Sequence, residues 1–510
     1  MARKTKPTAR KRKAAKAKRG AKLPARLWAI YALALIFGAV LLRLAVNALG
    51  WVPVHFDEGQ YWAYGHELAW GHFSKPPLVG WLILIATEFG GDTTFALRIF
   101  AVLAHAVIAW LVFLTGRRLF DGQTGFWAAV AYTAAPGVTA SSMIMSTDPV
   151  MMAGWAVALY AWVRAVEDPN RSAWHWWALL GAGLGLAMLA KYTAIAFVGG
   201  AVGYALFSAR GRAWPGVAMA VAVGGAIFLP NLLWQIANDF ATVGHVAEDA
   251  APAKAYDPLK FFEFFGAQFG VIGPVWFAVL LAALLTFRGW QSDWRMRLLA
   301  WQTFPLLLAM MGLALVTRAH PNWAAPAYVA GALLAARWLL TRDWISARTL
   351  ALKVQAGAGV VLGAALYVAA GVYAAMALDL PRGPDPFKKM RLSEPFCERV
   401  LAAMGEEGAE VILSNDRRRL SECMFLGGIG FSEIAVWNPD LIPSNHHELV
   451  ATLRPGDDRV MVLAVETDRL ARAIAKRFET AREIESGRFP THADRDFGFA
   501  IWAVQGFRDY

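Results

Sequence analysis

Charged residues are scarce in this chain. Asp, Glu, Lys and Arg make up only 17% of its 510 residues, against about 25% in an average soluble protein. Hydrophobic residues make up 57% of the chain, and the mean hydropathy is +0.40. This balance excludes a disordered chain, and it is not the balance of an ordinary soluble enzyme.

Cysteines are also few, and the common nucleotide-binding motifs are missing. Two cysteines exclude a small disulfide scaffold, and they have no zinc-type spacing. Cys397 and Cys423 could pair in an oxidising compartment or remain two buried thiols, and both possibilities stay open. The sequence has no P-loop, no G-x-G-x-x-G in a suitable context and no H-E-x-x-H. Nothing therefore indicates a protein driven by nucleotide hydrolysis.

The net charge of +12 belongs to one end of the chain. Residues 1–26 contain 12 Lys and Arg and no acidic residue, so the remaining 38 basic and 38 acidic residues cancel. Residues 27–378 have 36 charged residues and 21 of the 23 Trp, whereas residues 379–510 have 40 charged residues. We therefore predict a basic cytoplasmic tail, a membrane body and a soluble C-terminal domain with these bounds, and no nucleic-acid partner.

The body contains eleven stretches that are apolar enough to cross a membrane, for which about 20 residues are needed. The predicted spans are residues 27–49, 95–116, 123–140, 149–165, 174–190, 192–208, 214–235, 264–287, 298–316, 323–340 and 350–376. The apolar stretch 77–89 is too short, and we expect a re-entrant or interfacial segment there. The predicted fold class is a polytopic α-helical membrane protein with a C-terminal soluble α/β domain.

Positive charges predict the orientation. The basic tail places the N-terminus in the cytoplasm, and arginines recur in every second loop after it. Acidic residues occupy the other loops. The outer loops 50–94 and 236–263 and the C-terminal domain are then expected on the periplasmic face of a bacterial inner membrane, with loop 236–263 as a lid. No cleavable signal peptide is apparent.

The C-terminal domain has the alternating pattern of an α/β fold. Strands are predicted over residues 410–414, 459–465 and 498–504, and helices over residues 394–405, 416–426 and 467–477.

The first outer loop carries a candidate site. It begins with the adjacent carboxylates Asp57 and Glu58 and ends in Lys75-Pro76-Pro77. Between them lies an aromatic amphipathic helix that contains Tyr61 and is expected at the membrane interface. A solvated loop with a lipid-surface helix would explain an isolated pair of acids. The few charges of this loop flank the helix, however, and this arrangement favours a functional site.

Two further charged residues lie between apolar spans. Asp148 precedes Pro149 and can cap the next helix, which does not exclude a functional role. Lys191 lies between long uncharged stretches. An ammonium at membrane depth is costly, so we expect Lys191 to pair with a carboxylate or to bind an anion, although it could also extend to the headgroups. Arg43, inside the first span, is a weaker candidate for a buried pair.

Another short outer turn contains Arg318, His320 and Asn322. Together, these loops would place carboxylates and cations at one membrane face. A carboxylate can take a proton from a hydroxyl, while Lys and Arg can hold a phosphate and stabilise it as a leaving group. The residues therefore predict transfer from a lipid-phosphate donor.

Five motifs resemble, in chain order, those of the polyprenyl-phosphate-sugar-dependent glycosyltransferases of the GT-C fold. They are D-E-x-x-Y-W, F-S-K-P-P-L, T-D-P, A-K-Y and H-P-N-W-x-x-P-A-Y. This superfamily includes lipid A aminoarabinose transferases, lipopolysaccharide galacturonosyltransferases and protein O-mannosyltransferases. The resemblance covers residues 27–340.

The resemblance implies inverting transfer of a sugar from a polyprenyl monophosphate, such as undecaprenyl phosphate, to an acceptor hydroxyl or phosphate at the periplasmic face. Lipid A or lipopolysaccharide core is the first expected acceptor, and a protein hydroxyl is the alternative. From other classes, a flippase or transporter for a lipid-linked anion and a non-catalytic scaffold remain alternatives.

The resemblance also implies residue roles. Asp57 would be the catalytic carboxylate, Glu58 would support it, and Asp148 would be a second essential acid. Tyr61 and Asn322 would line the substrate site. The donor phosphate would be bound by Lys75, Lys191, Arg318 and His320.

The resemblance does not decide whether the protein binds a metal. In the aminoarabinose transferases, an acidic residue precedes the first-loop lysine and can take part in a metal site, but Ser74 stands at that position here. No cofactor is therefore firmly predicted. A divalent metal stays possible, with His55, His72 or His245 and a carboxylate as ligands.

Overall fold

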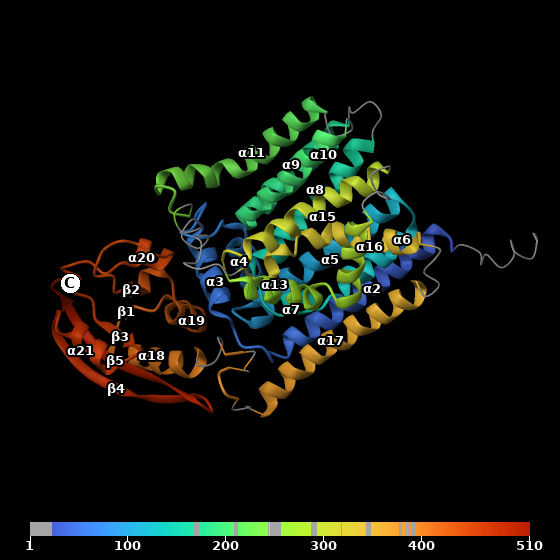
Figure 1. Cartoon of the computed structure of the whole chain (residues 1–510). Coiled ribbons are helices and arrows are strands. Elements are labelled where there is room, and N and C mark those ends of the chain that lie inside the picture. The colour runs from blue at the N-terminus through green and yellow to red at the C-terminus, as the bar shows by residue number, and fades with distance from the viewer. Residues whose placement is uncertain are drawn as a thin grey trace, which may run out of the picture.

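The protein consists of a helical body and a C-terminal sheet domain, which lies at one end of the body (Figure 1). The computed structural model describes residues 23–167, 173–208, 213–242, 244, 257–286, 293–317, 319–342, 348–376, 380–383, 385, 387–388 and 393–510. The predicted tail, except for its last four residues, lies outside these ranges.

The body is built from helices. In chain order they are α2 (Ala25–Ala48), α3 (Phe56–Glu67), α4 (Leu78–Gly90), α5 (Thr94–Leu119), α6 (Gly122–Thr133), α7 (Pro136–Ser141), α8 (Thr147–Glu167), α9 (Trp174–Ala190), the 3-10 turn η1 (Tyr192–Ile195), α10 (Ala196–Phe207), α11 (Trp214–Ala237), α13 (Pro258–Val271), α14 (Pro274–Leu285), α15 (Trp294–Leu313), the 3-10 turn η4 (Pro321–Ala324), α16 (Ala327–Leu340) and α17 (Arg348–Met376).

The predicted polytopic membrane fold is confirmed. Within the described residues, six helices are long and apolar enough to cross a membrane, namely α2, α5, α8, α11, α15 and α17. Helices α13 and α14 would make a seventh span as a pair, although they are bent by 116°. The shorter apolar helices are α4, which occupies the predicted re-entrant stretch, and α9, α10 with η1, and α16.

Two predicted spans are wrong as single helices, because each breaks at a proline. Residues 123–140 form α6 and α7, and residues 264–287 form α13 and α14. Pro136 begins α7, and the preceding Ala135 is extended at φ −66° and ψ 130°, since a residue before proline disfavours the helical region. Pro274 begins α14 after Gly273, whose φ of +100° suits glycine.

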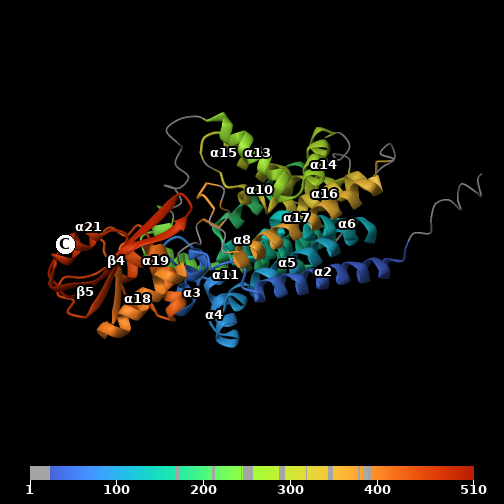
Figure 2. The same cartoon turned by 90° about the horizontal axis from the view of Figure 1, so that it is seen from below.

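The two ends of the body differ in charge. Helix α2 begins at the end away from the C-terminal domain and runs toward that domain (Figures 1 and 2). Arginines gather at the starting end, where Arg295 donates to the Leu119 carbonyl at 2.8 Å and Arg337 lies 3.4 Å from Asp121. Helix α3 lies at the other end, against the C-terminal domain.

The C-terminal domain is the predicted α/β fold. Its sheet has the order β2-β1-β3-β5-β4, with β1 parallel to β2 and β3, and β5 antiparallel to β3 and β4. All six predicted elements are present, and β2, β4 and α20 are additional. The elements are α18 (Ser393–Glu407), β1 (Val411–Ser414), α19 (Arg417–Gly427), the 3-10 turn η5 (Phe431–Glu433), β2 (Ile434–Val436), α20 (His446–Ala451), β3 (Met461–Val465), α21 (Asp468–Ala475), β4 (Phe478–His492) and β5 (Arg495–Phe507).

The C-terminal domain packs directly on the body through α19 and α3. A side chain at Gly59 would place its Cβ 2.5 Å from the Ser421 carbonyl oxygen, so this close approach requires glycine. One helical turn further along, Trp62 meets Phe425 edge to face. The domain is thus fixed on the helix that begins with the candidate carboxylates.

The two cysteines, for which the sequence left open a disulfide or two buried thiols, form a disulfide. Cys397 of α18 and Cys423 of α19 are bonded, and their Cα atoms are 5.0 Å apart. The bond therefore ties the helix that packs on α3 to the neighbouring helix of the domain.

Removing this disulfide should destabilise the C-terminal domain. The bond closes a loop of 26 residues, and releasing such a loop costs about 3 kcal/mol. We expect Cys397→Ser, or a reductant added to the native chain, to lower the unfolding temperature. The double variant with Cys423→Ser is the control, because reductant should not change it. Equal melting of the native chain with and without reductant would contradict the prediction.

Candidate active site

The first turn of α3 is fixed by a reciprocal cap. The Asp57 amide donates to His55 Nδ1 at 3.2 Å, and the His55 amide donates to Glu58 Oε2 at 3.0 Å. This capping box satisfies two amides that a helix start otherwise leaves unpaired. The side chain of Asp57 is 41% exposed, so its carboxylate can meet a substrate.

Glu58 is held in a different way, because it is completely buried. Arg98 of α5 grips its carboxylate through Nε at 2.8 Å and a terminal nitrogen at 2.7 Å. The Met145 amide donates to it as well, at 2.8 Å, so the carboxylate has four donors with the His55 amide. The remaining donors of Arg98 reach the carbonyls of Val52 and Pro53, each at 2.9 Å. Glu58 thus stabilises the start of α3 from inside the protein.

The sequence did not point to Arg98. It lies within a predicted membrane span, where a single buried arginine is costly unless it is paired. This cost indicates that Arg98 needs a partner, but the sequence does not show which of many carboxylates the partner is.

Asp148, Lys191 and Asn322 come together from three distant parts of the chain. Lys191 Nζ lies 2.7 Å from Asp148 Oδ1, and Asn322 donates to Asp148 Oδ2 at 2.8 Å. The side chains of the ion pair are only 13% and 19% exposed. The expected pairing of Lys191 with a carboxylate is confirmed, and a predicted acid and a predicted phosphate ligand prove to be partners.

Tyr61 lies close to both candidate acids. Burial is the main reason that its pKa is well above the ordinary value, and the negative charges of Asp57 and Asp148 raise it further. The phenol is therefore protonated and can donate a hydrogen bond. The charges of the two carboxylates thus act on one buried side chain.

Lys75 lies on a tight loop that follows α3. Its amide donates to the His72 carbonyl at 3.3 Å, and the His72 amide donates back to the Lys75 carbonyl at 3.0 Å. Thr242 also donates to the His72 carbonyl, and Gln235 joins Thr242 to Tyr192. Tyr192 follows the lysine of the ion pair, so this hydrogen-bond chain connects the loops that carry the two candidate lysines.

Other predicted residues are only partly placed. Arg318 and His245 lie outside the described residues, as do residues 243 and 245–256 of the predicted lid. His320 is exposed and contacts the Trp323 ring at 5.5 Å, just before Asn322.

A largely apolar cavity of about 380 Å³ opens beside Asp148 and Asn322. Its walls come from α5, α6, α7, α8, α13 and α16, and they include Val138, Ile144 and Met152. The polar ends of two site residues therefore adjoin a space that suits a hydrocarbon chain.

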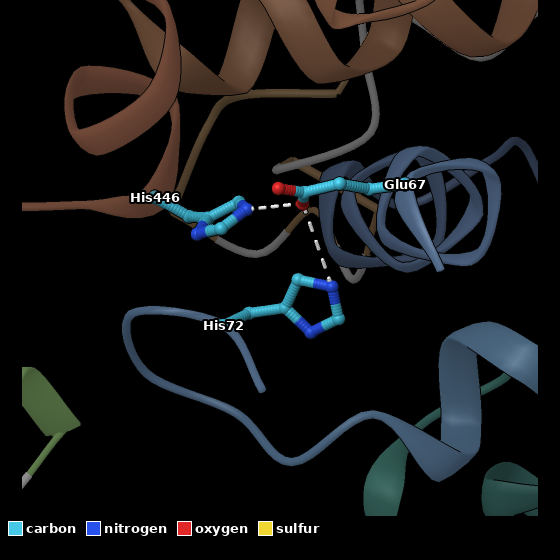
Figure 3. A group of neighbouring side chains, drawn as sticks. All are labelled: Glu67, His72 and His446. Atoms are coloured by element: carbon cyan, nitrogen blue, oxygen red, sulfur yellow. Dashed lines mark hydrogen bonds and ion pairs between the residues drawn. The ribbon is translucent and has the colours of Figure 1, made fainter. Parts of the chain in front are cut away.

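A second cluster of polar groups joins α3 to the C-terminal domain. Figure 3 shows the Glu67 carboxylate reaching the rings of His72 and His446. Glu67 Oε2 bonds His446 Nε2 and lies 3.7 Å from His72 Nε2. His72 is one of the possible ligands predicted from the sequence, whereas Glu67 and His446 were not predicted. His446 is 379 residues from Glu67 along the chain.

These three residues fit a divalent metal. One carboxylate oxygen and two imidazole nitrogens are donors that zinc prefers, and three protein ligands leave one position open. Both ring nitrogens of His72 are buried without a hydrogen-bond partner among the described residues. Burial, and then His446, lower the pKa of His72, so its imidazole is in the neutral form that binds a metal.

Loss of Arg98 should destabilise the whole chain. Arg98→Ala leaves the buried Glu58 carboxylate unpaired, which costs about 3–5 kcal/mol. We expect a lower unfolding temperature of the detergent-solubilised protein, and partial recovery when Glu58→Gln is added. Arg118→Ala, which removes an exposed pair with Glu167, is the control and should cost about 1 kcal/mol or less. An unchanged unfolding temperature of Arg98→Ala would disprove the structural role.

One family model and two relatives place the chain among known proteins. The family model described as dolichyl-phosphate-mannose-protein mannosyltransferase matches residues 74–234. The lipid A galacturonosyltransferase RgtD of Rhizobium johnstonii is 32% identical over 421 residues, which cover 82% of this chain and 86% of the relative. An undecaprenyl phosphate-α-4-amino-4-deoxy-L-arabinose arabinosyl transferase of Pseudomonas fluorescens is 26% identical over about a third of either chain.

The fold has solved counterparts. The crystal structure of ArnT from Cupriavidus metallidurans bound to undecaprenyl phosphate has a TM-score of 0.67, covers 94% of this chain and 98% of its own, and is 14% identical. The oligosaccharyltransferase of Archaeoglobus fulgidus has a TM-score of 0.50 at 12% identity and covers 79% of this chain and 64% of its own. The chain therefore belongs to the family of lipid A galacturonosyltransferase RgtD, within the polyprenyl-phosphate-sugar-dependent glycosyltransferases of the GT-C fold.

Proposed function

We propose that this chain transfers a sugar, with inversion, from a polyprenyl-monophosphate donor to lipid A or lipopolysaccharide core. The observation that carries the proposal is the position of the exposed Asp57 carboxylate. The charges of Asp57 and Asp148 both act on the buried Tyr61. Asp148 is paired with Lys191 and lines the apolar cavity. The family membership supports a transferase over the alternative of a transporter or flippase.

The donor is expected to use the cavity and the cations. Its isoprenoid chain would lie against the apolar walls, and its phosphate would meet Lys191 and Lys75. Because Lys191 is already paired with Asp148, the ammonium is held in place before the donor arrives. Fixed charges of this kind stabilise a leaving group without reorganising during the reaction.

Asp57 is the proposed general base. As the acceptor hydroxyl attacks the anomeric carbon, its proton passes to the Asp57 carboxylate. The bond between the anomeric carbon and the phosphate oxygen breaks on the opposite face, and the polyprenyl monophosphate leaves with the bonding pair. The protonated phenol of Tyr61 can donate a hydrogen bond within the same site.

The charge distribution supports a periplasmic site. The starting end of α2 follows the basic tail and carries the gathered arginines, and positive charge marks the cytoplasmic side. The C-terminal domain would then lie on the periplasmic side of a bacterial inner membrane. The Cys397–Cys423 bond agrees with this placement, because disulfides persist in that oxidising compartment.

Glu67, His72 and His446 would hold a divalent metal if one is bound. Such an ion would cross-link the end of α3 to the C-terminal domain and so stabilise their contact. The proton transfer and the attack assigned to this chain's residues do not depend on it.

The metal site has a direct test. We expect about one equivalent of zinc per chain by mass spectrometry of the purified protein, and a lower unfolding temperature after chelation. His446→Ala should lose the metal, because two remaining ligands do not hold it. His175→Ala, outside the cluster, should retain it. Equal metal content in native protein and His446→Ala would disprove the site.

Asp57→Asn should abolish transfer but leave folding intact, because the amide cannot accept the proton and Asp57 is not the buried partner of Arg98. The measurement is transfer from a polyprenyl-phosphate sugar to lipid A, followed by mass spectrometry, with the unfolding temperature recorded in parallel. Glu88→Gln, an exposed acid of α4, is the control. Retained transfer by Asp57→Asn would remove it from the catalytic role.

The acceptor class needs a second measurement. Lipid A and lipopolysaccharide from a deletion strain should lose one sugar by mass spectrometry, with no change in protein glycosylation. Loss of a protein-linked sugar alone would show that a protein is the acceptor.

A further inference from the structure

A small basic cleft lies between the start of α3 and the C-terminal domain. It has a volume of about 180 Å³, and Phe56, the first residue of α3, forms part of its wall. The charged residues that line it are the cations Arg382, Lys388, Arg418, Arg419 and Arg495 and the acids Asp416, Glu422 and Glu466.

The cleft has five cations and three acids, so a net charge of +2 remains. Arg419 pairs with Glu422 at 2.7 Å, and Asp416 accepts the Arg418 amide at 2.9 Å as the cap of α19. Arg382, Arg418 and Arg495 are exposed. In the part of the chain that the structure describes, none of these three guanidinium groups makes an ion pair.

Three separate segments bring these cations together. Arg382 follows α17 and donates its amide to Asp494 at 2.8 Å, which holds this connection against the turn before Arg495. Lys388 donates to the Gly383 carbonyl at 3.3 Å. Arg418 lies in the first turn of α19. The cleft is therefore a product of the docked C-terminal domain.

The residue before the proposed base forms part of the cleft wall. The Arg418 guanidinium lies 5.1 Å from the centre of the Phe56 ring, and Phe56 directly precedes Asp57. The close contact of Gly59 with Ser421 fixes α19 at this position on α3. A group bound by Arg418 is thus held next to the start of the helix that carries Asp57.

The cleft is separate from the space assigned to the donor. Its lining residues and those of the apolar cavity have no member in common. The cavity lies among membrane helices, whereas the cleft lies at the C-terminal domain. In an inverting transfer, the acceptor oxygen attacks the anomeric carbon on the face opposite the leaving phosphate. A second anion site, apart from the donor cavity, therefore suits the acceptor.

We propose that this cleft binds an anionic group of the glycolipid acceptor and thereby positions the acceptor hydroxyl at Asp57. The inference rests on the proposed transferase function and adds the recognition element of its acceptor. Guanidinium groups bind phosphate and carboxylate with paired hydrogen bonds. The bound group is therefore a phosphate of lipid A or a carboxylate of an acidic core sugar.

The test separates acceptor binding from chemistry. We expect Arg418→Gln and Arg495→Gln each to raise the KM for the acceptor about tenfold, the usual effect of losing one charge-assisted hydrogen bond. The KM for the donor and kcat at saturating acceptor should stay within about twofold of the native values. Arg472→Gln, an exposed arginine of α21 outside the cleft, should change none of these constants.

Two acceptors identify the bound group. With dephosphorylated lipid A, the native chain should show the same rise in KM, and Arg418→Gln should show little further change, if the cleft binds phosphate. With an acceptor that lacks acidic core sugars, the same pattern would assign a carboxylate.

An unchanged acceptor KM in folded, active Arg418→Gln and Arg495→Gln variants would overturn the proposed cleft while leaving the transferase function intact. A native chain that transfers no sugar to any lipid acceptor would instead disprove the proposed function. The unfolding temperature of each variant shows that a raised KM does not come from misfolding.

Discussion

The buried pair of Glu58 and Arg98 is the constraint on which the site depends. Arg98 donates to the Glu58 carboxylate and to two carbonyls before α3, and Glu58 also accepts the amides of His55 and Met145. One ion pair thereby fixes α5, the start of α3 and the chain just before α8. Because both charges are buried, neither can leave without a large loss of stability, and the exposed Asp57 beside them gains a fixed position.

The C-terminal domain completes this arrangement. Helix α19 packs on α3 at the Gly59–Ser421 contact, and His446 of α20 reaches the other end of α3 at Glu67. The domain therefore contacts α3 at both ends. From composition alone, this domain is predicted only to be a soluble C-terminal domain. In the structure, it forms one side of the candidate active site.

The protein also has two separate polar systems, which share no lining residue. On the side of the membrane helices lie Asp148, Lys191 and Asn322 at the mouth of an apolar cavity. On the side of the C-terminal domain lies the basic cleft with Arg418 and Arg495. This division agrees with a reaction that joins a lipid-linked donor to an anionic acceptor across one reacting carbon.

The sequence by itself determined the membrane body, the α/β domain and most of the candidate site, because these depend on local signals. Apolar runs predict spans, alternating runs predict strands, and an ammonium such as Lys191 in an apolar stretch needs a partner. The same local reasoning missed the breaks at Pro136 and Pro274, where single residues interrupt otherwise continuous apolar runs.

Only the tertiary structure decided which residues meet. Lys191 forms an ion pair with Asp148, and Glu58 forms one with Arg98. Cys397 is bonded to Cys423, and His446 is hydrogen-bonded to Glu67. The reason is physical: a buried charge or an imidazole shows in the sequence that it needs a partner, but partners that are tens to hundreds of residues apart are selected by packing. The C-terminal domain became part of the site for the same reason, through contacts between surfaces that no local pattern records.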